Sequence, residues 1–385
     1  MSSKTARPTE ARFCEPNRPR GTVSDVRLGT CIALELAVAA GAVGGIWFGV
    51  GHATQLAGTY LTGGEAVAAT PMTTARTPER LPRSFLEVAR PPIGNVFGAP
   101  DDELLAPLGA STVTHIKLNH GGTSLSLRVD FASGARAAFK PEQTHPQSDP
   151  RREIAAYRID RLLGIGHVPP AKATSIPVAE LLAAAEPGHR EFIAGRLEDE
   201  GIAHDGMLRG ELSWWVPEIR LAKIGPYRVD EKEGRELWTA YLQAGAKLPE
   251  EARPICEQLA ANILFDVLID NPDRWTGSNT EMSPDGKTLY FMDNTLSFSI
   301  FTLGHEQNLG ALRRIQVFPR ALVARIRALT EASLVDALAI SDDHGLGPLL
   351  NRSEIHAILV RRDHLIAYID EQIAELGESA VLSLP

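Results

Sequence analysis

One stretch of the sequence, residues 269–298, places charged and amide side chains at both ends of a short hairpin. A largely apolar segment, 255–269, runs directly into it with the spacing of a buried helix. Asp273 and Asn279 precede the turn signal P-D-G-K, and Asp293 follows the apolar run L-Y-F-M. Carboxylate and amide oxygens are the ligands that Mg²⁺ and related cations prefer. The stretch therefore predicts a site for a small, highly charged ligand such as a metal-bound phosphate.

Composition limits the class of protein. A chain of 385 residues that is 44% hydrophobic has enough material for a large folded unit with a tail. The net charge of −9 argues against a nucleic-acid-binding surface, because neutralising phosphates requires a basic face. Of the three cysteines, Cys14, Cys31 and Cys256, only the last lies in the part expected to fold. Neither a disulfide framework nor a disulfide-linked partner is therefore predicted.

The N-terminal quarter is expected to lie outside the folded domain. Residues 1–28 predict a disordered, basic N-terminus, and the small apolar residues 29–50 form a stretch long enough for a membrane-spanning helix. The basic flank on its N-terminal side predicts a single-pass topology with a cytosolic N-terminus and a translocated catalytic domain. A cleaved signal that leaves a secreted protein, and a buried or interfacial helix of a soluble protein, are the alternatives. Residues 51–95, rich in Ala, Thr, Gly and Pro, predict a flexible linker.

The remaining sequence predicts strands first and helices afterwards. Alternating apolar residues predict a hairpin of two strands, 124–131 and 135–140, with Gly121 and Gly122 just before it. Helical spacing predicts helices over 151–163, 255–269, 321–329, 334–340 and 352–376. This order predicts an α+β protein in which a small β-rich lobe precedes a larger helical lobe.

Four features match what phosphoryl transfer requires: a Gly-rich turn, a lysine on a strand, a glutamate on a helix, and the Asp and Asn residues around the hairpin. The lysine is Lys140 and the glutamate is Glu153. Each residue also has an ordinary structural explanation. Lys140 suits a strand end at the surface, Glu153 suits the first turn of a helix, Asp273 suits a turn after a proline, and Asp293 suits the end of a strand.

The order of several sequence blocks resembles the Golgi casein kinase and four-jointed group of atypical secretory-pathway kinases. The resembling blocks are G-G-T-S-L-S-L at 121–127, F-K-P at 139–141, E-I-A-A-Y-R-I-D-R-L-L at 153–163, V-P-P at 168–170, G-E-L-S-W-W-V-P at 210–217, D-R at 273–274 and D-N at 293–294. HipA-type and phosphoinositide-kinase-like enzymes share a looser form of the pattern. The match depends on the order and spacing of the blocks.

The resemblance implies a two-lobed, atypical protein-kinase-like fold over residues 96–385, with an N-lobe over about 96–180 and a C-lobe over about 181–385. It implies that Lys140 contacts the nucleotide phosphates and pairs with Glu153. It further implies that Asp273 is the catalytic base and that Asp293 is a metal ligand. Gly121 and Gly122 would form the nucleotide loop, with ATP and Mg²⁺ or Mn²⁺ as cofactors. Asn279, six residues after Asp273, is added as a second metal ligand.

The expected function is that of a kinase that moves the γ-phosphoryl group of ATP to a hydroxyl on a protein or a glycan. The alternative is a catalytically inactive pseudokinase that serves as a membrane-tethered nucleotide-binding or scaffold module. A sugar or lipid acceptor would keep the same chemistry. The sequence departs from the resembling group at residues 275–278. It also has Thr295 directly after Asp293 and Asn294, at a position where that group has a glycine. These departures bear on the acceptor more than on the phosphate chemistry.

Overall fold

The computed structural model describes residues 94–119, 123–276 and 279–385, which belong to one compact unit, Leu86–Pro385. The segments 1–28 and 29–50, most of the linker 51–95, and the glycines Gly121 and Gly122 lie outside the described residues. Within the described ranges, no helix combines the length and apolar character needed to cross a membrane.

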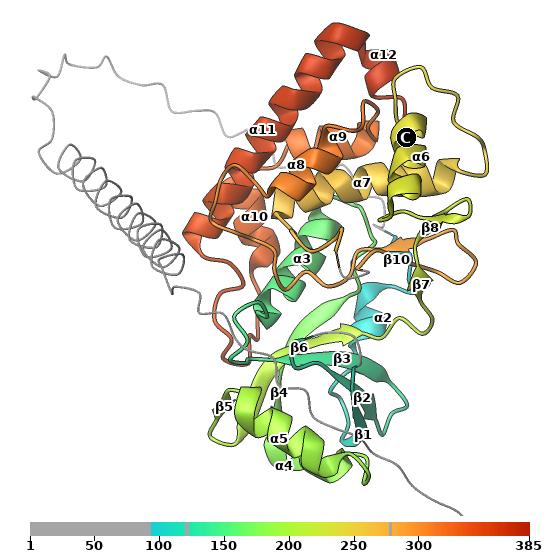
Figure 1. Cartoon of the computed structure of the whole chain (residues 1–385). Helices are drawn as coiled ribbons and strands as arrows, with labels where there is room; N and C mark the ends of the chain where they lie inside the picture. Colours follow the sequence, from blue (N-terminus) through green and yellow to red (C-terminus); the bar gives the residue numbers. More distant parts are fainter. Residues whose placement is uncertain (1–93, 120–122, 277–278) are drawn as a thin grey trace, which may run out of the picture. The chain divides into compact units, whose positions relative to one another are not determined.

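The first part of the unit is a six-stranded antiparallel sheet (Figure 1). Its strands are β1 (Val113–Leu118), β2 (Leu127–Phe131), β3 (Arg136–Pro141), β4 (Ala171–Pro177), β5 (Ala203–His204) and β6 (Met207–Trp214). The order along the sheet is β1-β2-β3-β6-β4, and β5 pairs with β6. Strand β2 begins three residues later than expected, because the Leu125 N–H bonds to the buried Gln143 side chain at 2.7 Å instead of entering the ladder.

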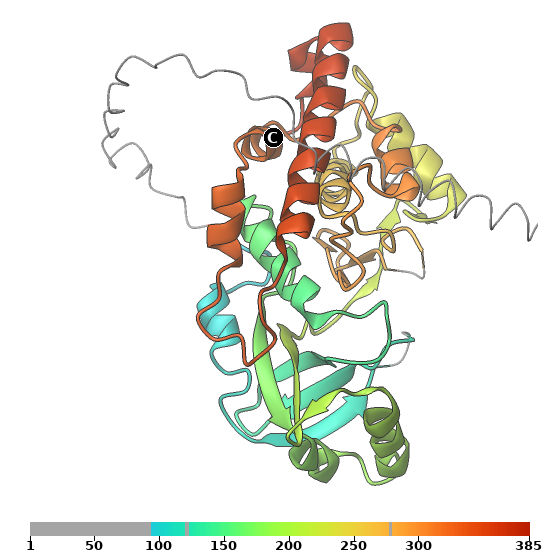
Figure 2. The same ribbon diagram turned by 90° about the vertical axis from the view of Figure 1, so that its left-hand side faces the viewer.

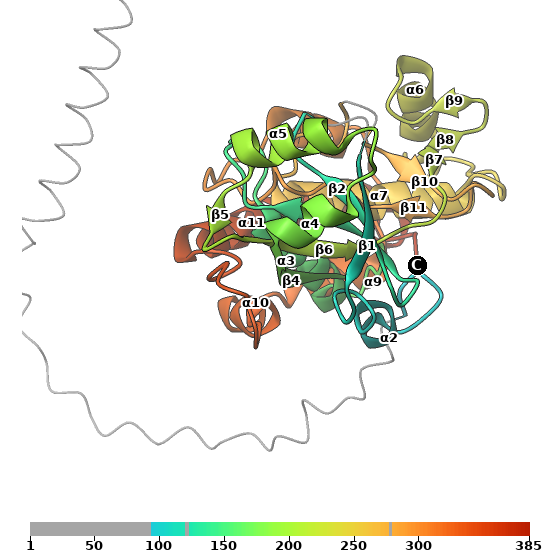
Figure 3. The same ribbon diagram turned by 90° about the horizontal axis from the view of Figure 1, so that it is seen from below.

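Two helices cover one face of this sheet, α4 (Val178–Ala184) and α5 (Arg190–Glu200), as Figure 3 shows from below. Leu181 and Ile193 from these helices share one buried cluster with Phe139 of the sheet. Residues 181–214 therefore belong to the small lobe. The expected lobe boundary near residue 180 falls too early, because β6 is needed between β3 and β4 to complete the sheet.

The second part of the unit is mainly helical. It begins with the short strands β7 (Arg220–Leu221), β8 (Lys223–Ile224) and β9 (Tyr227–Arg228). Its helices are α6 (Lys232–Tyr241), α7 (Arg253–Ile269), α8 (Glu306–Leu312), α9 (Arg320–Arg327), α10 (Glu331–Leu338), α11 (Arg352–Leu376) and α12 (Glu378–Val381). The short helix α2 (Asp101–Leu105) belongs to the first part. Strands β10 (Glu281–Met282) and β11 (Leu289–Tyr290) form the expected hairpin after α7. Helix α7 is buried along most of its length, as its apolar sequence predicts.

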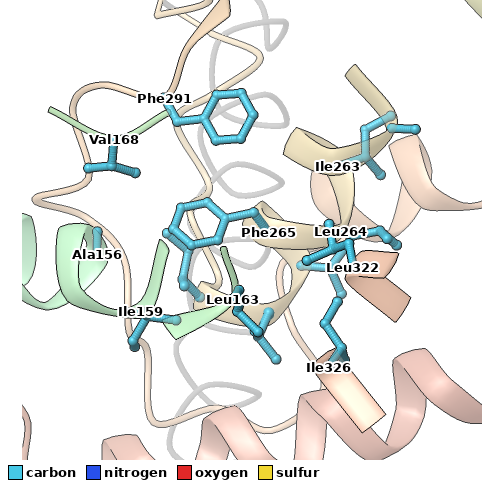
Figure 4. Close-up of a cluster of buried hydrophobic side chains, with 14 of the residues drawn as sticks. Ala156, Ile159, Leu163, Val168, Ile263, Leu264, Phe265, Phe291, Leu322 and Ile326 are labelled. Atoms are coloured by element: carbon cyan, nitrogen blue, oxygen red, sulfur yellow. The ribbon is translucent and has the colours of Figure 1, made fainter. Parts of the chain in front are cut away.

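Helix α3 (Pro150–Leu162) lies between the sheet and the C-terminal helices (Figures 1 and 2). The Asp149 side chain caps its first turn by accepting the Arg151 N–H, and Pro150 occupies the first helical position. Ile159 and its neighbours pack against Phe265 of α7 and Leu322 of α9 in the helical core (Figure 4). Glu153, in the first turn of α3, is thereby held at the junction of the two lobes.

Candidate active site

The backbone takes two left-handed turns that bring the hairpin to the sheet. Asp270 ends α7 with φ 56°, and Asp293 has φ 56° as well. Such values are uncommon for residues other than glycine and occur mostly at Asn and Asp. The Phe298 N–H bonds to the Ile269 carbonyl at 2.6 Å, which closes the segment on itself. Asp273 and Asp293 are therefore presented by one closed segment.

Lys140 joins the two lobes through a pair of carboxylates. From the end of β3, its Nζ lies 2.6 Å from Glu153 Oε1 on α3 and 3.0 Å from Asp293 Oδ1. Burial would lower the pKa of Lys140, but the charges of Asp293, Glu153 and Glu211 outweigh that effect and raise the pKa above its ordinary value of 10.5. The charge of Lys140 in turn lowers the pKa of the Asp293 carboxyl below 3.8. This ion pair stays charged over the working range of most proteins.

Glu153 is fixed from the other lobe as well. Its Oε1 accepts the backbone N–H of Asn294 at 3.0 Å, and its Oε2 accepts the Asn294 side-chain amide at 3.2 Å. Asn271 donates to the Asp293 carbonyl at 3.1 Å and to Asn294 Oδ1 at 3.2 Å. These two asparagines, both fully buried, connect the glutamate to the segment that carries the aspartates.

Asp273 sits in a turn whose neighbours orient its carboxylate. Asn271 Oδ1 accepts the Asp273 N–H at 3.1 Å, and Asn279 Nδ2 donates to Asp273 Oδ2 at 2.6 Å. The Thr276 hydroxyl donates to Asp273 Oδ1. The amide nitrogen of Asn279 is thus engaged with Asp273, and its Oδ1 is the atom left to face a cation. The structure therefore brings Asp273 and Asn279 into direct contact.

A buried ion pair supports this turn from behind. Arg274 Nε lies 3.1 Å from Asp266 Oδ2, with side-chain exposures of 0% and 1%. The same guanidinium donates to the carbonyls of Asn279 and Met292 and to Asn294 Oδ1. Burial raises the pKa of Asp266 to about 6, against the opposing charge of Arg274. Arg274 therefore ties together the helix, the turn and the end of the hairpin.

A cavity with a volume of about 580 Å³ lies between the lobes. Lys140, Glu153, Asn279 and Asp293 line its floor, and the segment from Ser213 to Val216 lines a wall. Its size falls in the range of small-molecule and cofactor sites. Lys140, Glu153, Asn279 and Asp293 thus meet in one cavity, while Asp273 reaches it through its hydrogen bond to Asn279.

Two further acidic residues line the same cavity, and sequence reasoning missed both. Glu211 stands opposite Lys140 in the register of β6 and β3 and is fully buried, with no hydrogen-bond partner for its Oε1 among the described residues. Burial, together with the charge of Glu153, raises the pKa of Glu211 to about 8. Burial raises the pKa of Glu281 to about 7. The sequence held one clue to Glu211, which lies on the same strand face as Ser213 in the block G-E-L-S-W-W-V-P. Its position opposite Lys140, however, depends on the register between β6 and β3.

The donor set fits a hard divalent cation that is also held by phosphate oxygens. Within the described ranges, no three His, Cys, Asp or Glu side chains are placed to enclose a metal by themselves. Mg²⁺ typically binds through one or two carboxylates plus substrate phosphates and water. Asp293 and Asn279 supply oxygen ligands of that kind, and Glu211 Oε1, buried without a hydrogen-bond partner among the described residues, adds a further oxygen nearby. The residues therefore suit a metal–nucleotide complex better than a bare metal.

The raised pKa of Glu211 predicts that replacing this carboxyl with a neutral side chain stabilises the protein more at high pH than at low pH. The pKa of Glu211 is about 8 in the folded protein and near 4.5 in the unfolded chain. Its contribution to the free energy of unfolding is therefore fully present below pH 4.5 and is lost as the pH rises through 8. We expect Glu211→Gln to raise the melting temperature by roughly 2–5 °C at pH 9 and to change it little at pH 5. Thermal unfolding at both pH values measures this. The exposed Glu218→Gln is the matched control, and an equal gain at both pH values would contradict the explanation.

No protein family model matches this sequence. Among curated proteins, the chain is 24% identical over 335 residues to the glycosaminoglycan xylosylkinase of Danio rerio, a match that covers 77% of this chain and 82% of that protein. It is 21% identical over 308 residues to the human extracellular serine/threonine protein kinase FAM20C, and the match spans 51% of that relative.

Solved structures show the same similarity in three dimensions. The Golgi casein kinase with Mn/ADP bound superposes with a TM-score of 0.58 at 19% identity, over 73% of this chain and 78% of that one. A hydra Fam20 structure with sugar gives 0.56 at 18% identity, over 72% of this chain and 90% of that one. The two-lobed kinase-like fold expected from the sequence is confirmed, and so is the resemblance to the Golgi casein kinase group.

Proposed function

We propose that this chain, similar in sequence and fold to the Golgi casein kinase group, is a kinase that transfers the γ-phosphoryl group of ATP to a hydroxyl of a protein or glycan. The observation that carries the proposal is the contact of Lys140 with both Glu153 and Asp293 in a cavity between two lobes. The chain's relatives in sequence are named as kinases, one of a glycosaminoglycan and one of protein serine or threonine. Both the catalytic residues and the acceptor class are parts of this proposal.

In the proposed reaction, the acceptor hydroxyl oxygen forms a bond to the γ-phosphorus while the bond from that phosphorus to the bridging oxygen breaks. ADP leaves with the electron pair of the broken bond, and the Asp273 carboxylate accepts the hydroxyl proton. Asn279 and Thr276 hold the carboxylate in position through their hydrogen bonds. Lys140, positioned by Glu153, neutralises charge on the nucleotide phosphates. Asp293 and Asn279 would hold the divalent cation, Mg²⁺ or Mn²⁺, which supplies further charge neutralisation when bound.

Transfer from γ-labelled ATP tests the proposal. We expect the full chain to label a glycan or a protein acceptor in the presence of Mn²⁺ or Mg²⁺, and to lose at least about 95% of the label transfer when a chelator is added, because the phosphates and cation bind as one complex. The acceptor panel contains serine-rich proteins and xylose-terminated glycans. Nucleotide binding without transfer to any acceptor would instead support a catalytically inactive pseudokinase module.

We also propose that residues 29–50 attach the chain to a membrane, with the catalytic unit on the translocated side. The apolar length of the stretch and its basic N-terminal flank support this. Flotation of the full chain with vesicles, with protease protection of the catalytic unit, tests both parts. Recovery of the chain without vesicles, or cleavage of the catalytic unit from outside, would contradict them.

A further inference from the structure

Residues 94–101 form a short segment ahead of the sheet, which we call the strap. Asn95 closes a turn within the strap. Its side-chain amide donates to the Ala99 carbonyl at 2.8 Å and to Asp101 Oδ1 at 2.7 Å. Its Oδ1 accepts the Phe97 N–H at 2.8 Å. These three hydrogen bonds fix the direction in which the turn presents the Phe97 ring.

The strap is fastened at both ends to α3 or to the loop that follows α3. The Val96 N–H bonds to the Gly166 carbonyl at 3.1 Å. A Cβ on Gly166 would lie 2.6 Å from the Gly94 carbonyl oxygen, so this close approach of the two backbones requires glycine. At the other end, the Asp101 carboxylate accepts Arg161 Nε at 2.7 Å and Arg161 Nη2 at 3.1 Å, which is a bidentate ion pair. The strap is therefore a fixed part of the catalytic unit.

The Phe97 ring contacts both lobes. It packs edge-on against Trp214, at the end of β6 in the small lobe, with ring centroids 5.5 Å apart. It stacks on Tyr290, in β11 of the helical lobe, with centroids 5.8 Å apart. The Arg161 guanidinium lies 6.0 Å from the centre of the same ring. Phe97 therefore joins the end of a small-lobe strand to the hairpin of the other lobe.

The segments that the strap contacts line the cavity between the lobes on their other side. Trp214 lines that cavity directly, and so does Met292, which follows β11 closely. Val168 lines it as well, and its carbonyl accepts Arg161 Nη2 at 3.0 Å. Phe97 itself does not line the cavity. It thus supports these walls from behind, at the point where the two lobes meet.

Strand register places the wall at Trp214 away from the proposed phosphate position. Lys140 pairs with Glu211, and Trp214 lies three residues further along β6, which is about 10 Å at the rise of a strand. If the phosphates bind at Lys140, the nucleoside end reaches the wall at Trp214. We infer that Phe97 is a positioning residue for the nucleotide, because the strap holds it where it fixes this wall. The inference rests on the proposed kinase function.

Phe97→Ala in the full chain tests the positioning role. We expect the dissociation constant of ADP with Mn²⁺, measured by calorimetry, to rise at least about tenfold, because the wall is in place in a smaller fraction of molecules. The KM for ATP should rise in parallel, while kcat at saturating ATP stays within about twofold. Lys140 and Asp273 keep their own hydrogen bonds, to Glu153 and to Asn279, in this variant. A general loss of folded protein would instead lower kcat and leave the dissociation constant unchanged.

Further variants separate the ring of Phe97 from the strap as a whole. Val96→Ala is the matched control, because that exposed side chain belongs to the same strap, and its ADP affinity should stay within about twofold of the parent chain. Phe97→Tyr keeps the ring and should restore the affinity to within about threefold. The melting temperature reports whether each variant is folded. If Phe97→Ala melts early, Phe97→Leu takes its place, and unchanged ADP affinity in the folded variant overturns the inference.

A double-mutant cycle tests the connection between the lobes. Tyr290 also lies behind the cavity, so Tyr290→Ala should weaken ADP binding, and Phe97→Ala with Tyr290→Ala should be no more than about twofold weaker than the weaker single variant. Fully independent effects of the two substitutions would overturn the connection.

The outcomes for Phe97 and for the kinase function are separable. Phosphoryl transfer by the parent chain, with equal ADP affinity in the parent and in folded Phe97→Ala, would leave the kinase function standing and reject the positioning role. Conversely, a parent chain that binds ADP but labels no acceptor would reject the kinase function, while the ADP titrations would still decide the role of Phe97.

Discussion

Asp273→Asn is expected to slow phosphoryl transfer by about a thousandfold while the nucleotide dissociation constant stays within about twofold. The substitution keeps the size of the side chain but removes the oxygen that accepts the acceptor proton. Asp273 does not line the cavity between the lobes, so phosphates bound there as proposed would lose no direct contact. Single-turnover transfer from labelled ATP, combined with a nucleotide titration, measures the two quantities separately.

Asp285→Asn provides the comparison for this variant. Asp285 belongs to the same hairpin and hydrogen-bonds the Ser283 hydroxyl at 2.6 Å, on the exposed turn away from the cavity. We expect its transfer rate to stay within about twofold of the parent chain, as for most surface substitutions. A transfer rate in Asp273→Asn equal to that of the parent would remove Asp273 from the role of base. Loss of nucleotide binding in the same variant would mean that the substitution damages the cavity itself.

Arg274→Met is expected to lower the free energy of unfolding by roughly 3–5 kcal/mol at pH 8, because it leaves the buried Asp266 carboxylate without its partner. Asp266 can protonate, and its pKa of about 6 rises further once the charge of Arg274 is gone. Because the pKa of Asp266 is raised in the folded protein, the variant loses free energy of unfolding as the pH rises through that pKa. The loss caused by Arg274→Met is therefore smaller at pH 5 than at pH 8. Urea unfolding at both pH values measures the difference.

Two variants serve as references for Arg274→Met. The exposed Arg313→Met, which removes only a surface pair with Glu306, is expected to cost less than about 1 kcal/mol. Adding Asp266→Asn to Arg274→Met is expected to recover part of the loss at pH 8, because the uncompensated charge disappears. A loss that is the same at pH 5 and pH 8 would mean that the carbonyl contacts of Arg274, and not its pairing with Asp266, dominate.

The elements with strong periodicity were predictable from the sequence. The helix expected over 352–376 is α11 residue for residue, and the helices expected over 151–163 and 255–269 differ from α3 and α7 by one or two residues. The contact between Lys140 and Glu153 also follows the expectation, because both residues lie in blocks whose order is informative. The two-residue strands β7, β8 and β9 escaped prediction, since two residues carry no period.

Contacts that depend on strand register or on irregular backbone could not be predicted. Glu211 meets Lys140 only because β6 pairs with β3 in one particular register, across a large separation in sequence. Asn271 and Asn294 bond to each other because left-handed turns at Asp270 and Asp293 turn the chain back on itself. No local pattern specifies those turns. Spacing therefore pointed to Lys140, Glu153 and Asp293, which line the cavity, but not to Glu211 or to the buried amides of Asn271 and Asn294.

The Lys140–Asp293 pair has a consequence for ligand affinity. In the free protein each of these side chains already has an oppositely charged partner, at the place where phosphate and cation are proposed to bind. Ligand entry is then an exchange of ionic partners, and the measured affinity is the difference between two sets of contacts. Nucleotide without metal would draw Lys140 away and leave Asp293 unpaired, whereas the complex with a cation supplies both with new partners. With nucleotide and cation bound as proposed, the ion pair would make the cleft discriminate between the free nucleotide and its metal complex.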